Sequence, residues 1–216
     1  MSVGNDVVDL ADPEARLDGL HPRFAARVWS AGERELLEAS RSRQALPWAL
    51  WAAKESAYKA LKRLAPETVF SPKEFEVGLS PLPPEGAGGV AAGWVVHRGR
   101  RFDLEVHLDG ASVHAVARIG EAPAGAGVLW KVGRAVGDPG VAVRRLAATA
   151  IGSALGLAPA GLRIVRRPPV ATHPDGRLAA DVSLSHHGRF VAFACTLAGQ
   201  RAGRVTSACC PGAPGS

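Results

Sequence analysis

The sequence has few cysteines and no long apolar run. Its three cysteines stand at positions 195, 209 and 210, a spacing that fits neither a disulfide framework nor a zinc site. Cys195 lies in an apolar run with nothing nearby that would lower its thiol pKa, so we expect a core residue rather than a nucleophile. No stretch reaches the roughly 18 apolar residues of a membrane-spanning helix, and the first residues do not resemble a signal peptide. We therefore expect a cytoplasmic protein that does not cross a membrane.

Several familiar motifs are also missing. A Walker phosphate loop, a Gly-x-Gly-x-x-Gly turn after a strand and a His-Glu-x-x-His helix do not occur, which argues against the usual nucleotide hydrolases, dinucleotide oxidoreductases and zinc proteases. Lys plus Arg exceed Asp plus Glu by 26 − 20 = 6. This basic balance suits nucleic acid, a phosphorylated cofactor or an acidic protein partner, and charge alone does not choose among them.

Hydrophobic periodicity predicts an α+β fold with two pseudosymmetric lobes, each a helix packed on an antiparallel sheet. The first lobe begins with the apolar run Val7-Val8, interpreted as the end of a strand. It continues with a helix that starts at the capping box Ser30-Ala-Gly-Glu33 and a longer helix over 48–64. An antiparallel meander follows, with strands expected at 75–77, 93–97, 102–107 and 113–117.

A Gly/Ala/Pro-rich stretch at 119–139 predicts the boundary between the lobes. The second lobe should contain a helix at 141–157, a short strand at 161–165 and a hairpin of strands at 182–185 and 190–197. We divide the chain into lobes 1–125 and 126–201 and a disordered tail, 202–216.

The longer helix of the first lobe carries the first candidate residues. Glu55 and Lys59 share a helical face with Trp48 and Trp51, and a carboxylate among tryptophans needs a compensating cation. An ordinary ion pair between Glu55 and Lys59, one turn apart, explains the same spacing. Spacing alone leaves both interpretations open.

A second carboxylate, Asp6, lies in Gly4-Asn-Asp-Val-Val-Asp9, at the expected end of a strand. Asp6 and Glu55 could share Mg²⁺, which accepts one or two protein carboxylates and completes its shell with water and phosphate oxygens. An Asn-Asp turn is the alternative for Asp6 taken by itself.

The third segment is Val182-Ser-Leu-Ser-His-His-Gly-Arg189. Ser185 and His186 could donate hydrogen bonds to a phosphate. A nucleophilic Ser-His pair is disfavoured, because adjacent residues of a strand point to opposite faces and no Gly-x-Ser-x-Gly elbow surrounds them. Phosphate binding is therefore the predicted role.

Together, Gly4-Asn-Asp6, Trp51-Ala-Ala-Lys-Glu-Ser-Ala-Tyr-Lys59 and Ser183-Leu-Ser-His186 resemble the hallmark motifs of the 4′-phosphopantetheinyl transferase superfamily. Arg23-Phe24 and Ser30…Glu33 resemble its Arg-Phe…Ser-x-x-Glu helix. The resemblance implies Mg²⁺-dependent transfer of the 4′-phosphopantetheine arm of coenzyme A to a serine of an apo acyl or peptidyl carrier protein, with release of 3′,5′-ADP. Carriers of fatty acid, polyketide or nonribosomal peptide synthesis are equally compatible.

The order of the motifs departs from the large, surfactin-synthetase-type members, in which the Ser-His lobe comes first. Here that lobe follows, as if moved to the C-terminus, so we expect a permuted, monomeric pseudodimer with coenzyme A between its lobes. The small holo-acyl-carrier-protein-synthase type has this motif order without a second lobe. Large members often carry a further carboxylate where Val8 stands; Asp9 matches the small type instead.

The resemblance also implies roles for single residues. Asp6 and Glu55 would hold Mg²⁺, Lys59 would add positive charge at the diphosphate, and Glu55 could take the proton of the carrier serine, directly or through a water. The residues expected to bind coenzyme A are Lys54, Lys59, Arg144, Arg145, Arg167, Ser185 and His186.

Two alternatives come from other classes of protein. A non-catalytic module that binds coenzyme A or the carrier is disfavoured by the intact set of Asp6, Glu55 and Lys59. A nucleic-acid-binding protein is disfavoured because the tryptophans of this sequence follow the spacing of core residues and its lysines are few.

Overall fold

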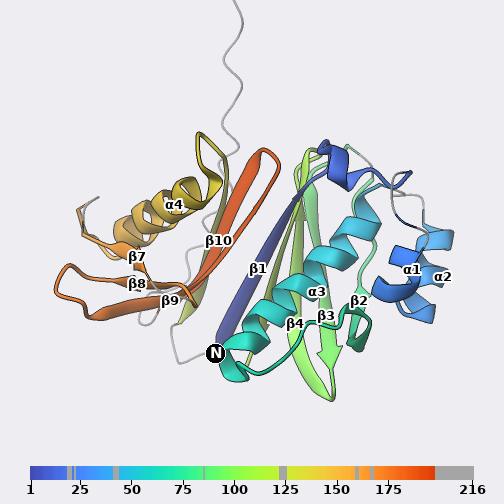
Figure 1. Ribbon diagram of the computed structural model, residues 1–216, viewed down its shortest axis with the longest axis horizontal. Coiled ribbons are helices and arrows are strands. Elements are labelled where there is room, and N and C mark those ends of the chain that lie inside the picture. Colours follow the sequence, from blue (N-terminus) through green and yellow to red (C-terminus); the bar gives the residue numbers. More distant parts are fainter. Residues whose placement is uncertain are drawn as a thin grey trace, which may run out of the picture.

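The structure is a computed structural model that describes residues 1–18, 21, 23–40, 44–84, 86–121, 126–158, 161–165 and 168–197 (Figure 1). The N-terminal sheet contains β1 to β5, at Ser2–Asp9, Phe75–Leu79, Gly89–His97, Arg100–Leu108 and Ser112–Ile119. The C-terminal sheet contains β6 to β10, at Gly127–Arg134, Arg163–Val165, Val170–Thr172, Leu178–His187 and Phe190–Leu197. The helices are α1 (Arg23–Val28), α2 (Ala31–Ala39), α3 (Ala45–Leu64) and α4 (Pro139–Ala154), with 3-10 turns η1 (Pro13–Ala15) and η2 (Pro72–Glu74).

The two sheets have the same topology. Their strand orders are β1-β5-β4-β3-β2 and β6-β10-β9-β8-β7. In each, the long helix, α3 or α4, comes between the first and second strands, and the remaining strands form an antiparallel meander that returns to the first. This repetition confirms the expected α+β fold with two pseudosymmetric lobes. The expected lobe boundary falls next to residues 122–125, which lie outside the described residues, as does the tail 202–216.

Two element predictions were wrong. The stretch 119–139, expected as the boundary between the lobes, contains β6, whose partly buried Val128, Trp130 and Val132 pack against residues of the N-terminal sheet. Val7 and Val8 lie at the end of a strand, as expected, but β1 begins at Ser2, so Asp6 lies inside a strand rather than at its end or in a turn. Glycine and polar residues obscured the strand pattern, but pairing with β5 along its whole length supplies the missing order.

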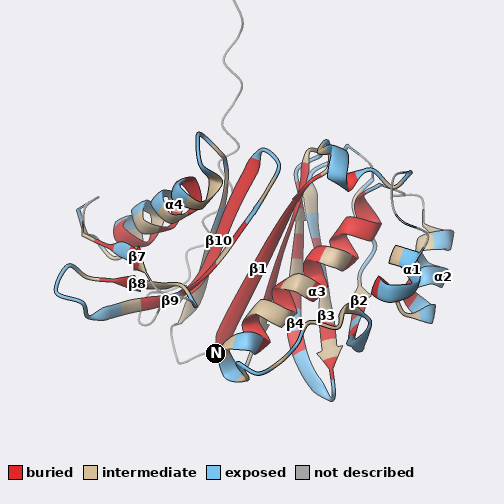
Figure 2. Ribbon diagram, viewed as in Figure 1, coloured by how far each residue is buried: buried red, intermediate tan, exposed pale blue. Residues whose placement is uncertain are grey.

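Close contact between α3 and β1 depends on Gly4. A Cβ at this position would collide with the backbone of Ser56 and Ala60 on α3. The helix presents small residues to the sheet, with Ala53, Ala57 and Ala60 all fully buried, and Figure 2 shows the buried stripe along α3 and β1. Glycine is therefore needed here for close backbone approach rather than for a turn.

Lys54 is the largest fully buried side chain, and its position contradicts the expectation that it binds coenzyme A. Its Nζ lies 2.8 Å from Glu33 Oε2 and donates to the carbonyls of Pro72 (3.0 Å) and Phe75 (2.5 Å). Glu33 also completes the predicted capping box with Ser30. Lys54 therefore ties α2, α3 and β2 together within the core, and has no access to a ligand.

Two other expectations can be compared with the structure. Cys195 is fully buried, and burial raises the pKa of its thiol to about 12, which confirms a core residue. Of the helices within the described ranges, none has both the length and the apolar character needed to cross a bilayer.

Replacing Lys54 tests the buried ion pair. Lys54→Met should lower the free energy of unfolding by about 3–5 kcal/mol, because it leaves the Glu33 carboxylate buried without a cation. The measurement is urea unfolding, with the exposed Lys73→Met as control. The double variant Lys54→Met/Glu33→Gln should regain part of the loss; a Lys54→Met variant as stable as Lys73→Met would contradict the structural role.

Candidate functional site

The candidate site lies where the open edge of β1 meets the face of β9. Three backbone N–H groups of β1 donate to side chains of β9: Asn5 to Ser183 Oγ (3.0 Å), Val7 to Ser185 Oγ (3.1 Å) and Asp9 to His187 Nδ1 (3.2 Å). We call this series the interlobe ladder. The three contacts can form in a row because the N–H groups on one edge of a strand recur every second residue, and so do the side chains on one face of another strand.

Asp6 is the centre of the site. Its Oδ1 accepts from Lys59 Nζ on α3 and from Ser185 Oγ on β9, both at 2.7 Å. Lys59 Nζ also donates to the Asn5 carbonyl (3.2 Å). Segments 4–6, 54–59 and 183–187, far apart in the sequence, therefore meet at one carboxylate.

Glu55 lies near enough to Asp6 for the two charges to interact. It does not form the ion pair with Lys59 that its spacing allowed, since Lys59 pairs with Asp6. Burial raises the pKa of Glu55 to about 7; the charge of Lys59 lowers it and that of Asp6 raises it. A part-buried carboxylate whose charge interacts with that of a second carboxylate, with one lysine offsetting both charges, is a favourable setting for a divalent cation.

Removing the Glu55 charge should therefore stabilise the metal-free protein. Because folding raises its pKa, Glu55 favours the folded state below pH 4.5, its ordinary pKa, and this contribution is lost as the pH rises through about 7. Glu55→Gln should be more stable than wild type by about 2 kcal/mol at pH 8 and by little at pH 4.5. Thermal unfolding in EDTA across this range measures the difference. The exposed Glu38→Gln is the control. If the difference in stability between Glu55→Gln and wild type did not change with pH, the expected cost of the buried Glu55 charge would be refuted.

Asp9, the further carboxylate of the same strand, is held by Arg189. Arg189 Nε donates to Asp9 Oδ2 and Nη2 donates to Oδ1, both at 2.7 Å, and the Arg189 backbone N–H also donates to Oδ2 (3.0 Å). These bonds hold the Asp9 pKa well below its usual range. With only 1% of its side chain exposed, Asp9 fastens the β9–β10 turn to β1 and is not free to bind a metal.

The contribution of Asp9 should depend on pH. Because its pKa is lowered on folding, the stability it provides is present above its ordinary pKa of 3.8 and is lost as the pH falls below it. Arg189→Met should therefore be clearly less stable than wild type at pH 6, and the gap should narrow below pH 4. Arg177→Met is the matched control, since Arg177 and Asp175 form a comparable pair that is exposed on both sides. Equal effects of the two variants at pH 6 would contradict this role.

One other cluster has the composition of a metal site. Side-chain ligand atoms of Asp12, Glu14 and His187 lie within 4.8 Å of one another. However, Nδ1 of His187 accepts from the Asp9 N–H, so a neutral ring carries its proton on Nε2 and has no free lone pair. We assign no metal to this cluster.

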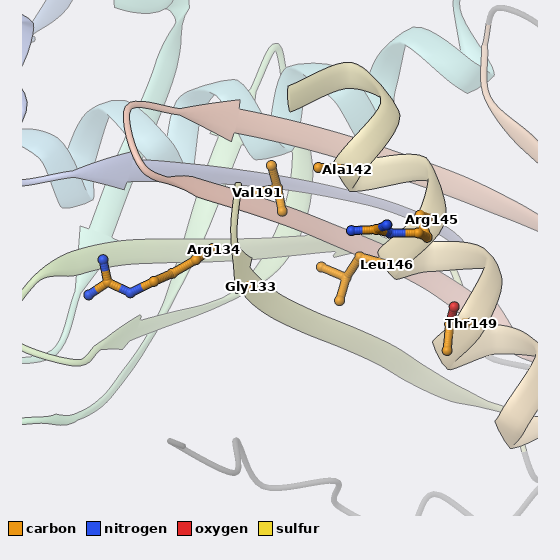
Figure 3. A pocket seen from close by; sticks show the side chains of 7 residues that line it. All are labelled: Gly133, Arg134, Ala142, Arg145, Leu146, Thr149 and Val191. Atoms are coloured by element: carbon orange, nitrogen blue, oxygen red, sulfur yellow. The ribbon is translucent and has the colours of Figure 1, made fainter. Parts of the chain in front are cut away.

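The structure separates the other predicted ligands of coenzyme A from Asp6. His186 is exposed and points to the face of β9 opposite Ser185, the face covered by α4, where it pairs across the strands with Val191. Val191 lines a groove of about 240 Å³ between α4 and β6, together with Arg145, Thr149 and Arg134 (Figure 3). Arg144 Nη1 is bonded to the Gly140 carbonyl (2.9 Å). Arg167 lies outside the described residues.

Several residues of the site were not assigned a role from the sequence. Ser183 and His187 extend the interlobe ladder on either side of Ser185, and Arg189 neutralises Asp9. The alternation Ser183-x-Ser185-x-His187 places three polar groups on one strand face, which was a usable signal for a polar interface. The partner on β1 could not be inferred from it.

His114, behind the site, is structural. Burial lowers its pKa to about 3, helped by the charges of His107 and Lys59, so the ring is neutral. Its Nε2 lies 3.2 Å from Asn5 Nδ2, and its ring contacts Trp130 of β6. It therefore provides neither charge nor a proton acceptor for chemistry near neutral pH.

Comparison with known proteins finds a family match for the N-terminal segment. Residues 2–87 match the model of the 4′-phosphopantetheinyl transferase superfamily. This match includes β1 with Gly4 and Asp6, and α3 with Glu55 and Lys59. A search of curated proteins found no match. Among solved structures, holo-[acyl-carrier-protein] synthase of Thermotoga maritima matches with 16% identity over 65% of this chain and 71% of that chain, at a TM-score of 0.36. A superposition of that quality does not establish a common fold.

The match to the 4′-phosphopantetheinyl transferase superfamily covers residues 2–87 of the 216-residue chain, and it supports phosphopantetheinyl transfer as the general activity. The match ends before β3, so it does not reach β6 to β10. The origin of the C-terminal lobe in a permutation of the large members stays a prediction.

Proposed function

We propose that this chain is a Mg²⁺-dependent 4′-phosphopantetheinyl transferase that modifies a serine of an apo acyl or peptidyl carrier protein. The carrier serine oxygen would bond to the phosphorus that bears the pantetheine arm. The bond from that phosphorus to the bridging diphosphate oxygen would break, releasing 3′,5′-ADP. One observation carries the proposal: the Asp6 carboxylate accepts hydrogen bonds from Lys59 and from Ser185 of the other lobe. Asp6 and Lys59 both lie in the segment that matches the family.

The donors at this place fit magnesium. Asp6 has one oxygen, Oδ1, bonded to Lys59 and Ser185, and Oδ2 has no partner among the described residues. The high pKa of Glu55 reflects a carboxylate that lacks a compensating bond. Asp6 Oδ2 and the Glu55 carboxylate would hold Mg²⁺. This hard cation binds one or two protein carboxylates and completes its coordination shell with water and phosphate oxygens. When bound, Mg²⁺ would neutralise charge on the diphosphate.

The side chains of α3 would divide the remaining work. Lys59, which is part-exposed, would add a positive charge at the diphosphate, where charge on the leaving group develops. Glu55 would accept the proton of the carrier serine at its carboxylate, directly or through a metal-bound water.

The rest of coenzyme A would lie along β9. Pairing of β9 with β8 ends at Asp181 in the described residues, so the segment that contains Ser185 and His186 is bordered by β10 alone. A long ligand over this edge would reach Asp6 on one face and His186 on the other. Arg145, in the groove beneath α4, and Arg144 are then candidates for its 3′-phosphate, since a planar guanidinium suits phosphate.

Because both lobes are supplied by one chain, we propose a monomer. The excess of basic residues would favour encounter with a carrier, since these are typically acidic. The direct test incubates the protein with apo acyl or peptidyl carrier protein, coenzyme A and Mg²⁺ and measures the mass of the carrier. The carrier should gain the phosphopantetheine mass, and EDTA should prevent the gain.

Glu55→Gln should lower kcat at least about 100-fold while the protein remains folded, since it removes a metal ligand and the proton acceptor together. The exposed Glu38→Gln should keep normal activity. Near-normal activity of Glu55→Gln would show that the metal and proton roles are misassigned.

The assay also separates the alternatives. Coenzyme A binding without any gain of carrier mass, across several carriers, would favour a non-catalytic binding module. Steeply salt-dependent DNA binding with no response to coenzyme A would favour a nucleic-acid-binding protein.

A further inference from the structure

We propose that Ser185 is a positioning residue for the Asp6 carboxylate, and that through it the C-terminal lobe controls the metal affinity of the N-terminal lobe. This inference rests on the proposed function only in taking Asp6 as a ligand of Mg²⁺. It replaces the expectation that Ser185 binds phosphate.

The hydrogen bonds of Ser185 account for its single proton. Its Oγ accepts from the Val7 N–H and donates to Asp6 Oδ1. A phosphate oxygen can only accept a hydrogen bond, and a hydroxyl has one proton to donate. The side chain is buried between the lobes, so Ser185 serves the carboxylate instead of a substrate phosphate.

Asp6 is held from two lobes at once. Lys59 reaches Oδ1 from α3, and Ser185 reaches the same oxygen from β9. Two donors on one oxygen fix the rotation of the carboxylate and leave Oδ2 for a cation. Ser185 is uncharged, so it orients Asp6 without cancelling the negative charge that attracts the metal, whereas Lys59 offsets that charge. Such neutral partners of metal ligands typically tune affinity.

Ser183 provides a natural comparison. It is the preceding step of the interlobe ladder, equally buried (5% exposed against 6% for Ser185), and its Oγ accepts from the Asn5 N–H at 3.0 Å, against 3.1 Å at Val7. It contacts β1 in the same way but makes no bond to Asp6. Any effect of Ser185 that Ser183 does not share therefore comes from the Asp6 bond.

The experiment titrates Mg²⁺ alone, without coenzyme A, into metal-free wild type, Ser185→Ala and Ser183→Ala by isothermal titration calorimetry. Ser185→Ala should raise the Kd for Mg²⁺ about tenfold or more. Ser183→Ala should stay within about twofold of wild type, since it leaves the neighbours of Asp6 unchanged. Ser185→Thr, which keeps the hydroxyl, should restore most of the affinity.

Thermal unfolding in EDTA is the structural control. Both alanine variants should lose stability, because each leaves one N–H of β1 unpaired, and Ser185→Ala should lose somewhat more, because it also removes the bond to Asp6. If Ser185→Ala does not fold, the Mg²⁺ titration compares Ser185→Cys with Ser183→Cys instead, because cysteine fills the space of serine but is a weak hydrogen-bond donor.

Equal Mg²⁺ affinity for Ser185→Ala and wild type would overturn the inference, and so would equal losses in both alanine variants. In either case the proposed function would stand. Wild type that binds no Mg²⁺ at all would instead overturn the assignment of Asp6 as a ligand, and this inference with it.

Discussion

The open edge of β1 is the constraint on which the rest of the structure depends. An edge strand has a row of unpaired N–H groups, and leaving them buried without partners is costly. Here the face of β9 provides side-chain acceptors at every second residue, Ser183, Ser185 and His187. The two lobes are therefore joined by hydrogen bonds as well as by apolar contact. Because Ser185 of the interlobe ladder also donates to Asp6, one side chain both joins the lobes and contacts the candidate site.

The repeated topology creates two related junctions, which differ in the side chains that fill them. At the first, β1 meets β9 with Asp6, Lys59 and Ser185. At the related junction, β6 meets β4 and β5, and Trp130 packs on the rings of His107 and His114. Aromatic packing fills the second junction and keeps His114 neutral. The polar residues that could bind a charged ligand are thereby concentrated at one place.

Helix α3 shows how one element serves structure and site with adjacent residues. Lys54 points into the core and pairs with Glu33, whereas Glu55 remains without a cation and Lys59 turns to Asp6. The buried pair stabilises the helix against α2 and β2, and that rigidity allows the helix to hold Glu55 in an unfavourable setting. A metal would relieve the cost, which is the usual relation between stability and a binding site.

The sequence by itself determined the α+β class, the two long helices, the meander and the three segments that resemble the family. These follow from local periodicity, capping and motif spacing. It also identified Asp6, Glu55 and Lys59 as candidates, because a carboxylate on a packed helix needs a partner.

Only the tertiary structure decided what each candidate touches. Adjacent residues point in different directions: Lys54 and Glu55 are about 100° apart around the helix, and Ser185 and His186 lie on opposite faces of the strand. A motif lists such residues together, although the fold gives them different neighbours. The strand β6 and the full length of β1 also depended on pairing with distant residues. Whether a side chain binds a ligand or another lobe depends on contacts between residues more than 100 positions apart, and these carry no local signal.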